Sequence, residues 1–436
     1  MFLGQGTSKS EQGIGPGVAY INALAVDGAG NVVLCGEFTG AVDFGGGMLD
    51  AAGDTNFSFF VVKLAPSGAH VWSRSFGDGT HQQCSAIAVD AAGNVIIGGA
   101  SAGGVDFGAG HQPATAPGWG PFVAKFDPDG ELIWAEIYDA QEAEVHALAV
   151  DALGNIVAAG RLSEHVDFGA GPLVSTYGRG AYVVKLDPSG DEVWSREFSC
   201  LNGSTSAVDV AVDGADSVIL AGQFSGSIDL GAGLLAGAGR RDAFVVKLDS
   251  EGVSLWGNVY GDAADQAVTA VAAGADGRVL LAGDFTGEID LGAGRLVGRG
   301  DAEDRDIFVA MLDASGVAQW SRSLGNSTWQ AAAGVALEPT GNALLIGGTD
   351  DPVRLGPVPH VAVASRDVLV ARFDAAGELL WKAQYGDGDG QWGTAVASTP
   401  PGHVVLAAIG RGGIDFGHGL HRSPETWSSF VARLAP

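Results

Sequence analysis

The sequence predicts an all-β fold made of seven similar units, and three observations support this prediction. First, the segment from Tyr182 to Phe198, YVVKLDPSGDEVWSREF, returns in related copies along the whole chain. Second, the numbers of the tryptophans in these copies differ by 60 to 64: Trp72, Trp134, Trp194, Trp256, Trp320 and Trp381. Third, no stretch of adequate length has the 3.6-residue periodicity of a helix. A repeat of this length indicates an array of one structural unit rather than several unrelated domains.

Each unit contains four strand-like runs separated by turn sequences, as the second unit shows. Its apolar runs lie at 86–89, 95–100, 122–126 and 132–137. Glycine-containing turns, Asp90-Ala-Ala-Gly-Asn94 and Asp127-Pro-Asp-Gly130, join the first run to the second and the third to the fourth. The connection between the second and third runs is long and contains the sequence VDFG. We therefore predict a four-stranded antiparallel meander in each unit.

Two features indicate that the units close into a ring rather than an open solenoid. The first strand of every unit has alanine at one equivalent position, as strands crowded around a central axis require: Ala25, Ala88, Ala149, Ala211, Ala272, Ala336 and Ala397. The last unit has three strands, whereas Phe2-Leu3-Gly4 at the N-terminus matches the end of a fourth strand. The prediction is one domain, 1–436, forming a single seven-bladed β-propeller of four-stranded antiparallel blades, closed by an N-terminal strand that completes the C-terminal blade.

The recurring motifs FVVKLDxxGxxxW, AVDxxGNVxxxG and VDFGxG resemble those of a seven-bladed β-propeller repeat family of bacterial proteins. The resemblance covers essentially the whole chain and implies the propeller fold. Members of that family are mostly uncharacterised surface or secreted proteins, so the resemblance implies an extracellular or cell-surface location and leaves the activity open. The sixth and seventh units depart from the pattern at 338–342, 353–357 and 399–403.

The composition limits the classes of partner. With 23 Lys and Arg against 51 Asp and Glu, the net charge of −28 opposes binding to nucleic acid and to anionic membranes. The sequence has neither a signal peptide nor a run of about 18 apolar residues, so no membrane insertion is expected. Cys35, Cys84 and Cys200 occupy different repeat positions and show no metal-ligand spacing. We expect a monomer with no cofactor and no bound metal.

Two sets of recurring residues are interpreted as structural. Six units carry an aspartate in the VDFG-like motif, and these six carboxylates raise a calcium hypothesis: Asp43, Asp106, Asp167, Asp229, Asp290 and Asp415. However, Ca²⁺ takes about 6–8 oxygens around one point, and one carboxylate per unit spreads them around a ring. We therefore interpret these aspartates as caps that bind backbone N–H groups of their own loop. The recurring tryptophans are interpreted as packing between blades.

Candidate ligand contacts are the residues that break the repeat where an outer strand crosses to the next inner strand. Four crossings share a glutamine, which can bind a ligand or tie neighbouring strands together: Gln82, Gln266, Gln330 and Gln391. Trp329 and Trp392 lie in successive crossings, close to Asp387 and Asp389. This combination suits carbohydrate stacking or a protein hot spot, or else each ring covers a neighbouring loop. Asp209 replaces a small residue of the other innermost strands and must be paired, hydrated or shifted in pKa.

These observations favour a non-enzymatic binding module or interaction scaffold that engages a glycan or a protein through its loop face. An alternative is a polysaccharide or lactone lyase or hydrolase with a site in the central funnel, using Asp209 or Glu144 with His81 or His146. A second alternative is a structural spacer domain of a larger protein. No catalytic residue is assigned, because no triad-like or His-x-x-x-His spacing is present.

Overall fold

The computed structural model describes residues 2–3, 17–52, 56–113, 118–299, 304–325, 328–350, 366–387, 389–399, 402–416, 421–422 and 427–434. The sixth-unit departure at 353–357 lies outside these residues. Every regular element in the described ranges is a strand, and none of these ranges contains a helix long and apolar enough to cross a membrane.

Seven four-stranded antiparallel sheets are present in the described part of the chain. The first three sheets are formed by β2 (Val18–Val26), β3 (Val32–Thr39), β6 (Ser58–Leu64) and β7 (His70–Phe76); by β8 (Gln82–Val89), β9 (Val95–Ser101), β12 (Gly120–Phe126) and β13 (Leu132–Ile137); and by β15 (Ala143–Val150), β16 (Ile156–Leu162), β19 (Gly180–Leu186) and β20 (Glu192–Phe198).

The next three sheets are formed by β22 (Thr205–Val212), β23 (Val218–Phe224), β26 (Asp242–Leu248) and β27 (Ser254–Tyr260); by β28 (Gln266–Ala273), β29 (Val279–Phe285), β32 (Asp306–Leu312) and β33 (Ala318–Leu324); and by β34 (Gln330–Leu337), β35 (Ala343–Thr349), β36 (Asp367–Phe373) and β37 (Leu379–Tyr385). The seventh sheet is formed by β38 (Gln391–Thr399), β39 (His403–Gly410), β42 (Ser428–Leu434) and β1 (Phe2–Leu3).

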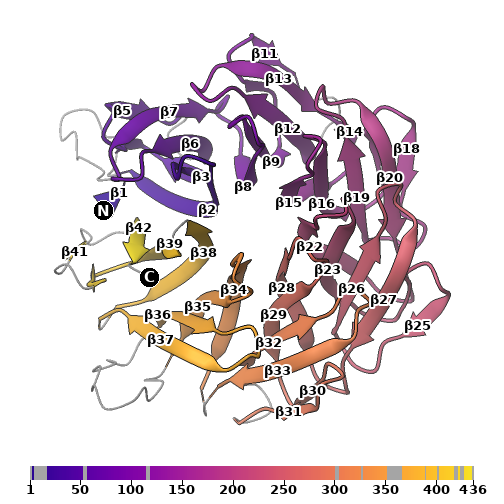
Figure 1. The fold of residues 1–436 in the computed structure, drawn as a ribbon. Helices are drawn as coiled ribbons and strands as arrows, with labels where there is room; N and C mark the ends of the chain where they lie inside the picture. The colour runs from indigo at the N-terminus through magenta and orange to yellow at the C-terminus, as the bar shows by residue number, and fades with distance from the viewer. Residues whose placement is uncertain are drawn as a thin grey trace.

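Figure 1 shows these sheets arranged around a central axis, with the first strand of each sheet nearest the axis. This architecture is a β-propeller. The second and third strands of each sheet are almost entirely buried along their length, as in β6 and β19. Both faces of these strands are covered because each sheet packs between two neighbours, which explains the near-continuous apolar runs in the sequence.

Seven clusters of buried apolar side chains hold neighbouring sheets together. One of them joins the last sheet to the first, because Val405 and Ala407 of β39 pack with Ile21 of β2 and Leu34 of β3. The recurring tryptophans reinforce the first five contacts between sheets. Trp72, for example, donates its indole N–H to the carbonyl of Pro128 in the next sheet at 2.9 Å. The predicted packing of tryptophans between blades is confirmed.

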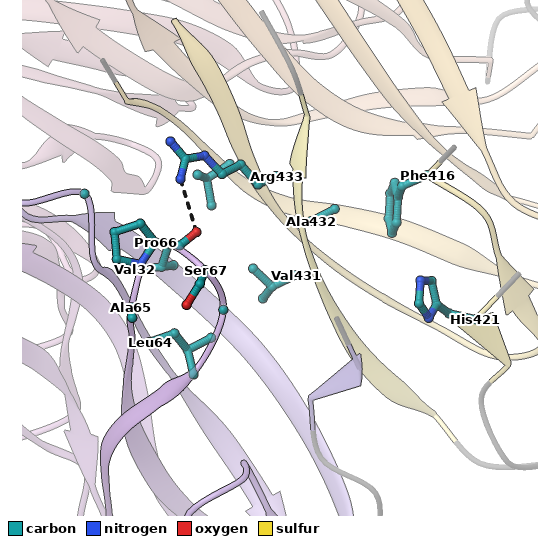
Figure 2. Close-up of a pocket in the computed structure, with 13 residues that line it drawn as sticks. Val32, Leu64, Ala65, Pro66, Ser67, Phe416, His421, Val431, Ala432 and Arg433 are labelled. Atoms are coloured by element: carbon teal, nitrogen blue, oxygen red, sulfur yellow. Dashed lines mark hydrogen bonds between the residues drawn. The ribbon is translucent and has the colours of Figure 1, made fainter. Parts of the chain in front are cut away.

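Contacts between the seventh and first sheets include the N-terminal strand. Leu3 of β1 pairs with Ser429 of β42, as Phe76 pairs with Phe59 in the first sheet. The Ser429 hydroxyl donates to the carbonyl of Ala19 at 2.8 Å and accepts the N–H of Ile21 at 3.0 Å. A cavity of about 210 Å³ also lies between the two sheets, and Figure 2 shows the residues that line it. Arg433 donates to the carbonyl of Pro66 at its edge, at 3.1 Å.

In six of the seven sheets the connection between the second and third strands, predicted only as a long connection, forms a small hairpin in the described residues. These hairpin strands are β4 (Ala41–Asp43) and β5 (Met48–Asp50); β10 (Val105–Asp106) and β11 (His111–Gln112); β17 (His165–Asp167) and β18 (Pro172–Val174); β24 (Ser227–Asp229) and β25 (Leu234–Ala236); β30 (Glu288–Asp290) and β31 (Arg295–Val297); and β40 (Gly413–Ile414) and β41 (His421–Arg422). The two-residue strands β14 (Asp139–Ala140) and β21 (Cys200–Leu201) join two of them. Asp43 accepts the N–H groups of Gly45 and Gly47, at 2.7 and 3.1 Å, which confirms the capping prediction there.

Candidate binding face

One face of the propeller carries the crossing loops, and we call it the crossing face. It consists of the described residues that lead from the outer strand of one sheet to the innermost strand of the next, at 77–81, 138–142, 199–204, 261–265, 325, 328–329, 386–387 and 389–390. The first two residues of each of these innermost strands and the residue before each third strand also belong to it. All site residues predicted from the sequence except Asp209 lie on this face. Asp209 lies on β22, beside the central axis.

The four predicted glutamines are buried, each with 1% exposure or less, at the start of an innermost strand. Their side chains hold the crossing loops. The Gln266 amide donates to the Asp262 carboxylate at 2.6 Å, and its carbonyl oxygen accepts the Asp262 N–H at 3.2 Å. Gln391 and Asp387 form the same reciprocal pair, at 2.8 and 3.1 Å. Gln82 and Gln330 donate to Thr80 and Thr328, at 2.6 and 3.1 Å. Contact between these amides and a ligand stays a prediction.

The two predicted tryptophans meet between the sixth and seventh sheets. The ring centroids of Trp329 and Trp392 are 4.9 Å apart, with 43° between the planes. Gly348 of β35 lies beneath Trp392, because a Cβ at that position would be 2.8 Å from the indole. Both rings are half-buried, so each retains surface for a partner.

Arg366 completes this cluster and was missed by the sequence analysis. Its guanidinium lies 4.4 Å from the ring centre of Trp329 and 5.7 Å from that of Trp392. Its Nε also donates to the carboxylate of Asp350 at 3.2 Å. Cation–π contacts and an ion pair therefore place an exposed cation against two aromatic rings. Asp389, also predicted, lies exposed in the neighbouring crossing loop, where its N–H donates to Asp387 at 2.9 Å.

Arg366 belongs to a ring of seven equivalent residues, each immediately before the third strand of its sheet. We call these residues the crossing-face ring: Phe57, Trp119, Arg179, Arg241, Arg305, Arg366 and Trp427. The carbonyls of the first six accept N–H groups from the next innermost strand, as Arg179 does from Thr205 at 3.1 Å. Only aromatic residues and arginine occupy these positions. This pattern was present in the sequence and becomes visible when the units are aligned on their third strands.

The ring has an aromatic part and a basic part. Around the first and second sheets, Phe57 lies 6.1 Å from Tyr20 and 5.5 Å from His81, and His81 lies 5.0 Å from Trp119. Trp427 lies under the guanidinium of Arg411 at 5.0 Å. The third to sixth sheets contribute the four arginines. The four arginines place positive charges on this part of the face, whereas the chain as a whole has a net charge of −28.

Polar side chains also converge on the central axis. Each innermost strand has a register shift, a β-bulge in its middle, and the extra residues there are Asn22, Ser85, His146, Val208, Thr269, Ala333 and Thr394. With Asp209 they line a cavity of about 390 Å³. The Asp209 carboxylate accepts the N–H of Val210 and that of Val271 in the next sheet, both at 2.8 Å. Burial raises the pKa of Asp209 to about 6, although these hydrogen bonds oppose the rise.

The residues considered for an enzymatic site are mostly engaged in structural contacts. The Glu144 carboxylate lies 3.2 Å from Nε2 of His146 and 2.8 Å from Arg161. Hydrogen bonds from His146 and Arg161 lower the pKa of Glu144 to about 2, against the effect of burial. Nδ1 of His146 donates to the carbonyl of Ala207 at 2.8 Å. His81 lies on the crossing face, 3.7 Å from Glu37.

Comparisons with known proteins show limited likenesses. No protein-family model matches the chain. A stretch of 112 residues is 32% identical to an uncharacterized WD repeat-containing protein of Acanthamoeba polyphaga mimivirus. The match covers 24% of this chain and only 8% of the viral protein.

Two solved structures are similar over most of their length. Sqt1 from Chaetomium thermophilum is 12% identical, with a TM-score of 0.44, and the match covers 89% of this chain and 94% of that one. The β-propeller domain of the Trilobed protease from Pyrococcus furiosus is 8% identical, also with a TM-score of 0.44, and the match covers 94% and 96% of the two chains. None of these likenesses assigns a ligand to the chain.

Proposed function

We propose that the chain is a non-enzymatic protein-interaction scaffold whose partner binds the crossing face. The cluster of Trp329, Trp392 and Arg366 is the observation that carries this proposal. Tryptophan and arginine are the residue types most enriched among those that dominate binding energy at protein interfaces. Here the three side chains already contact one another, at 4.9 and 4.4 Å. Little side-chain entropy remains to be lost when a partner binds.

The shape of the cluster favours a protein over a carbohydrate. A sugar ring stacks best on an open, flat aromatic face, whereas the two indoles are tilted by 43° and Arg366 covers one of them. The crossing-face ring extends the same mixture of aromatic and guanidinium groups around the axis. We propose that Asp389 contacts the partner directly, and that Asp387 and the four glutamines contribute by holding the loops in place.

We further propose that residues 1–436 form one closed ring of seven blades and act as a monomer. The pairing of β1 with β42, the hydrogen bonds of Ser429 and the apolar cluster around Ile21 support this proposal. A closed ring would hold the loops of all seven sheets rigidly on one face. Loops positioned by a rigid scaffold are a common site of recognition.

The test is selection of peptides from a displayed random library on the intact chain, followed by measurement of their affinity by calorimetry. We expect binding that falls at least tenfold in a Trp329→Ala, Trp392→Ala double variant, since truncated hot-spot residues typically cost about 2 kcal/mol or more. Tyr177→Ala provides a matched control, because Tyr177 is an aromatic residue with 55% exposure that lies outside the cluster. Its affinity should be unchanged.

Circular dichroism and thermal unfolding establish that each variant is folded. A glycan array probed with the same three proteins distinguishes the alternatives. Binding to glycans alone, lost in the double variant, would contradict the protein-scaffold proposal in favour of a carbohydrate-binding module. If neither peptides nor glycans bind the intact chain, the hypothesis of a structural spacer domain replaces the protein-scaffold proposal.

A further inference from the structure

A third cavity opens on the crossing face between the third and fourth sheets, away from the tryptophan cluster. Its volume is about 260 Å³, and its lining is dominated by cations and hydroxyls: Arg161, Arg179, Arg240, Arg241, Ser204, Thr205, Ser206 and Ser225. Gln223 contributes an amide. In a chain with 23 basic against 51 acidic residues, four arginines around one small cavity form a marked local excess of positive charge.

Arg241 of this cavity lacks the ion pair that its equivalent in the fifth sheet forms. In the fifth sheet, Arg305 of the crossing-face ring pairs with Asp284 at 2.9 Å. The residue equivalent to Asp284 in the fourth sheet is Gln223, opposite Ala243 in β26 as Asp284 is opposite Ile307 in β32. An uncharged amide thus stands at the equivalent place in its own sheet. Arg241 instead acts on Asp284 of the next sheet at longer range, since burial raises the pKa of Asp284 and the charges of Arg305 and Arg241 oppose that rise. Within the ranges that the structure describes, Nε of Arg241 is buried without a hydrogen-bond acceptor.

The other three arginines differ in how they are compensated. Arg161 pairs with Glu144 at 2.8 Å. Arg179 and Arg240 are exposed, and neither forms an ion pair with any described residue. The guanidinium groups of Arg179 and Arg240 are therefore available at the cavity, and Arg241 contributes an Nε–H donor that has no acceptor among the described residues. Such groups present rigid sets of N–H donors that match the oxygens of phosphate and sulfate. The positive charge of several guanidinium groups is also more than one carboxylate can neutralise.

We propose that this cavity is an oxyanion site that takes a phosphate or sulfate group, with Arg179, Arg240 and Arg241 as its charged donors. The Ser206 hydroxyl and the Gln223 amide supply neutral donors from neighbouring strands. The chemistry is the one by which arginine clusters recognise phosphorylated groups. The site is separate from the cluster that carries the partner-binding proposal, because Trp329 and Trp392 lie between the sixth and seventh sheets, but it shares Arg179 and Arg241 with the crossing-face ring.

Calorimetric titration of the whole protein with inorganic phosphate, in a buffer free of other oxyanions, tests the proposal. We expect one site per chain, competition by sulfate, and at least tenfold weaker binding of acetate. Arg179→Gln and Arg240→Gln should each weaken phosphate binding by roughly tenfold, because each removes charge-assisted hydrogen bonds. Arg295→Gln is the matched control, since Arg295 is 61% exposed, pairs with Glu288 and lies on the outer hairpin of the fifth sheet.

A second measurement does not depend on variants. Phenylglyoxal modifies accessible arginines, and mass spectrometry reports which ones; phosphate should protect Arg179 and Arg240 but not Arg295. Comparison of free phosphate, O-phosphoserine and sulfate then shows which source of the group the site prefers. Equal binding of acetate and phosphate would overturn the proposal. So would an equal loss of affinity in Arg295→Gln, or the absence of protection at Arg179 and Arg240.

Discussion

Asp209 places a carboxylate where the other innermost strands have alanine or glycine. This position determines its hydrogen bonds and its pKa. It links the fourth and fifth sheets through the N–H of Val271. Burial nevertheless raises its pKa from 3.8 to about 6. In the folded protein the carboxylic acid therefore holds its proton over a pH range in which the unfolded chain has released it. The contribution of Asp209 to stability falls as the pH rises from about 4 to about 6 and stays low above that.

We predict that Asp209→Ala removes this dependence. The free energy of unfolding of the variant, relative to the original protein, should increase between pH 4 and pH 6.5, by up to about 3 kcal/mol, since one pKa unit corresponds to about 1.4 kcal/mol. Loss of the two hydrogen bonds offsets part of this gain by a pH-independent amount. Urea unfolding at several pH values measures the difference. A difference that stays constant with pH would contradict the raised pKa.

A buried ion pair behaves in the opposite way, as Lys185 and Asp151 illustrate. Nζ of Lys185 lies 2.8 Å from the Asp151 carboxylate, and the side chains are 5% and 0% exposed. Burial alone would raise the pKa of Asp151, but hydrogen bonds from Lys185 and Asn155 outweigh it and lower the pKa. Lys185→Met should therefore destabilise the protein by roughly 3–5 kcal/mol at pH 7, because it leaves a buried carboxylate without its cation. Urea unfolding measures this loss.

Two further variants separate the ion pair from general effects of substitution. Adding Asp151→Asn to Lys185→Met should recover part of the stability, because the unpaired charge is removed as well. Glu131→Gln breaks the surface pair of Glu131 with Arg74, whose side chains are 74% and 40% exposed, and should cost less than about 1 kcal/mol. Equal losses from Lys185→Met and Glu131→Gln would show that burial does not set the energy of the pair.

At the scale of residues, side chains that interrupt the repeat were easier to recognise in the sequence than a set of equivalent residues shared by all seven units. Trp329 and Trp392 stood out because they interrupt the repeat, and the structure brings them together at 4.9 Å. Arg366 was missed because arginine before a polar residue looks like an ordinary solvated side chain. Its significance depends on register: only an alignment on the third strands shows that all seven equivalents are aromatic or arginine. The cavity beside Arg241 could not be foreseen, since it depends on side chains from separate sheets.

At the scale of elements, the third and fourth strands of the units were predictable because their apolar runs and turns recur. The hairpins between second and third strands were not, since strands of two or three residues are too short for an alternating pattern. The fourth strands also carry the contact that joins successive sheets. The indole of Trp194, for example, donates to the carbonyl of Ser250 at 2.9 Å and lies against Gly252.

The cavity between the seventh and first sheets is lined by a turn carbonyl and a turn glycine equivalent to those that these tryptophans contact in the other sheets. Pro66 and Gly68 are the equivalents of Ser250 and Gly252, and both line the cavity of about 210 Å³ (Figure 2). We predict that free indole binds there, because engineered apolar cavities of about 150 Å³ already bind benzene. Its N–H should donate to the Pro66 carbonyl. 1-Methylindole should bind roughly fivefold more weakly, since it lacks this donor.

Calorimetry with the two compounds measures the difference. Val431→Phe is the companion variant, because Val431 lines the cavity and belongs to the apolar cluster that joins the seventh and first sheets, so a larger side chain there would occupy the cavity. Indole binding should be lost in this variant while the protein remains folded. Equal affinity for indole and 1-methylindole would show that the Pro66 carbonyl does not accept the hydrogen bond, and unchanged binding in Val431→Phe would place the compound elsewhere.

At the scale of the whole molecule, the sequence predicted an array of seven units from its period, and the described residues contain seven four-stranded sheets. Closure was inferred from two weak signals, the small residues near the axis and the N-terminal match to an outer strand. The structure adds contacts that no repeat pattern could supply. Ser429 occupies the place of Phe59, and only in this sheet does a hydroxyl at that position bind the neighbouring innermost strand.

The proposed closed ring would affect the stability of the first and last sheets. In an open array each repeat contacts only its neighbours, and the end repeats unfold most readily. In a closed ring every sheet has two neighbours, so no sheet is an end. We predict that hydrogen exchange, followed by mass spectrometry, will give β3 and β39 protection comparable to that of β23 in the fourth sheet. Faster exchange of β3 and β39 alone would contradict a closed ring.

The hydrogen bonds of Ser429 should then contribute to the stability of all seven sheets rather than to that of one sheet. Ser429→Ala leaves the buried N–H of Ile21 and the carbonyl of Ala19 without their partner, which should cost about 1–3 kcal/mol. In a closed ring this loss lowers the protection of β23 as well as that of β3 and β39, because the sheets unfold together. Ser189→Ala, at an exposed turn in the third sheet, should leave all three strands unchanged. A loss confined to β3 and β39 would mean that the first and seventh sheets open independently of the rest.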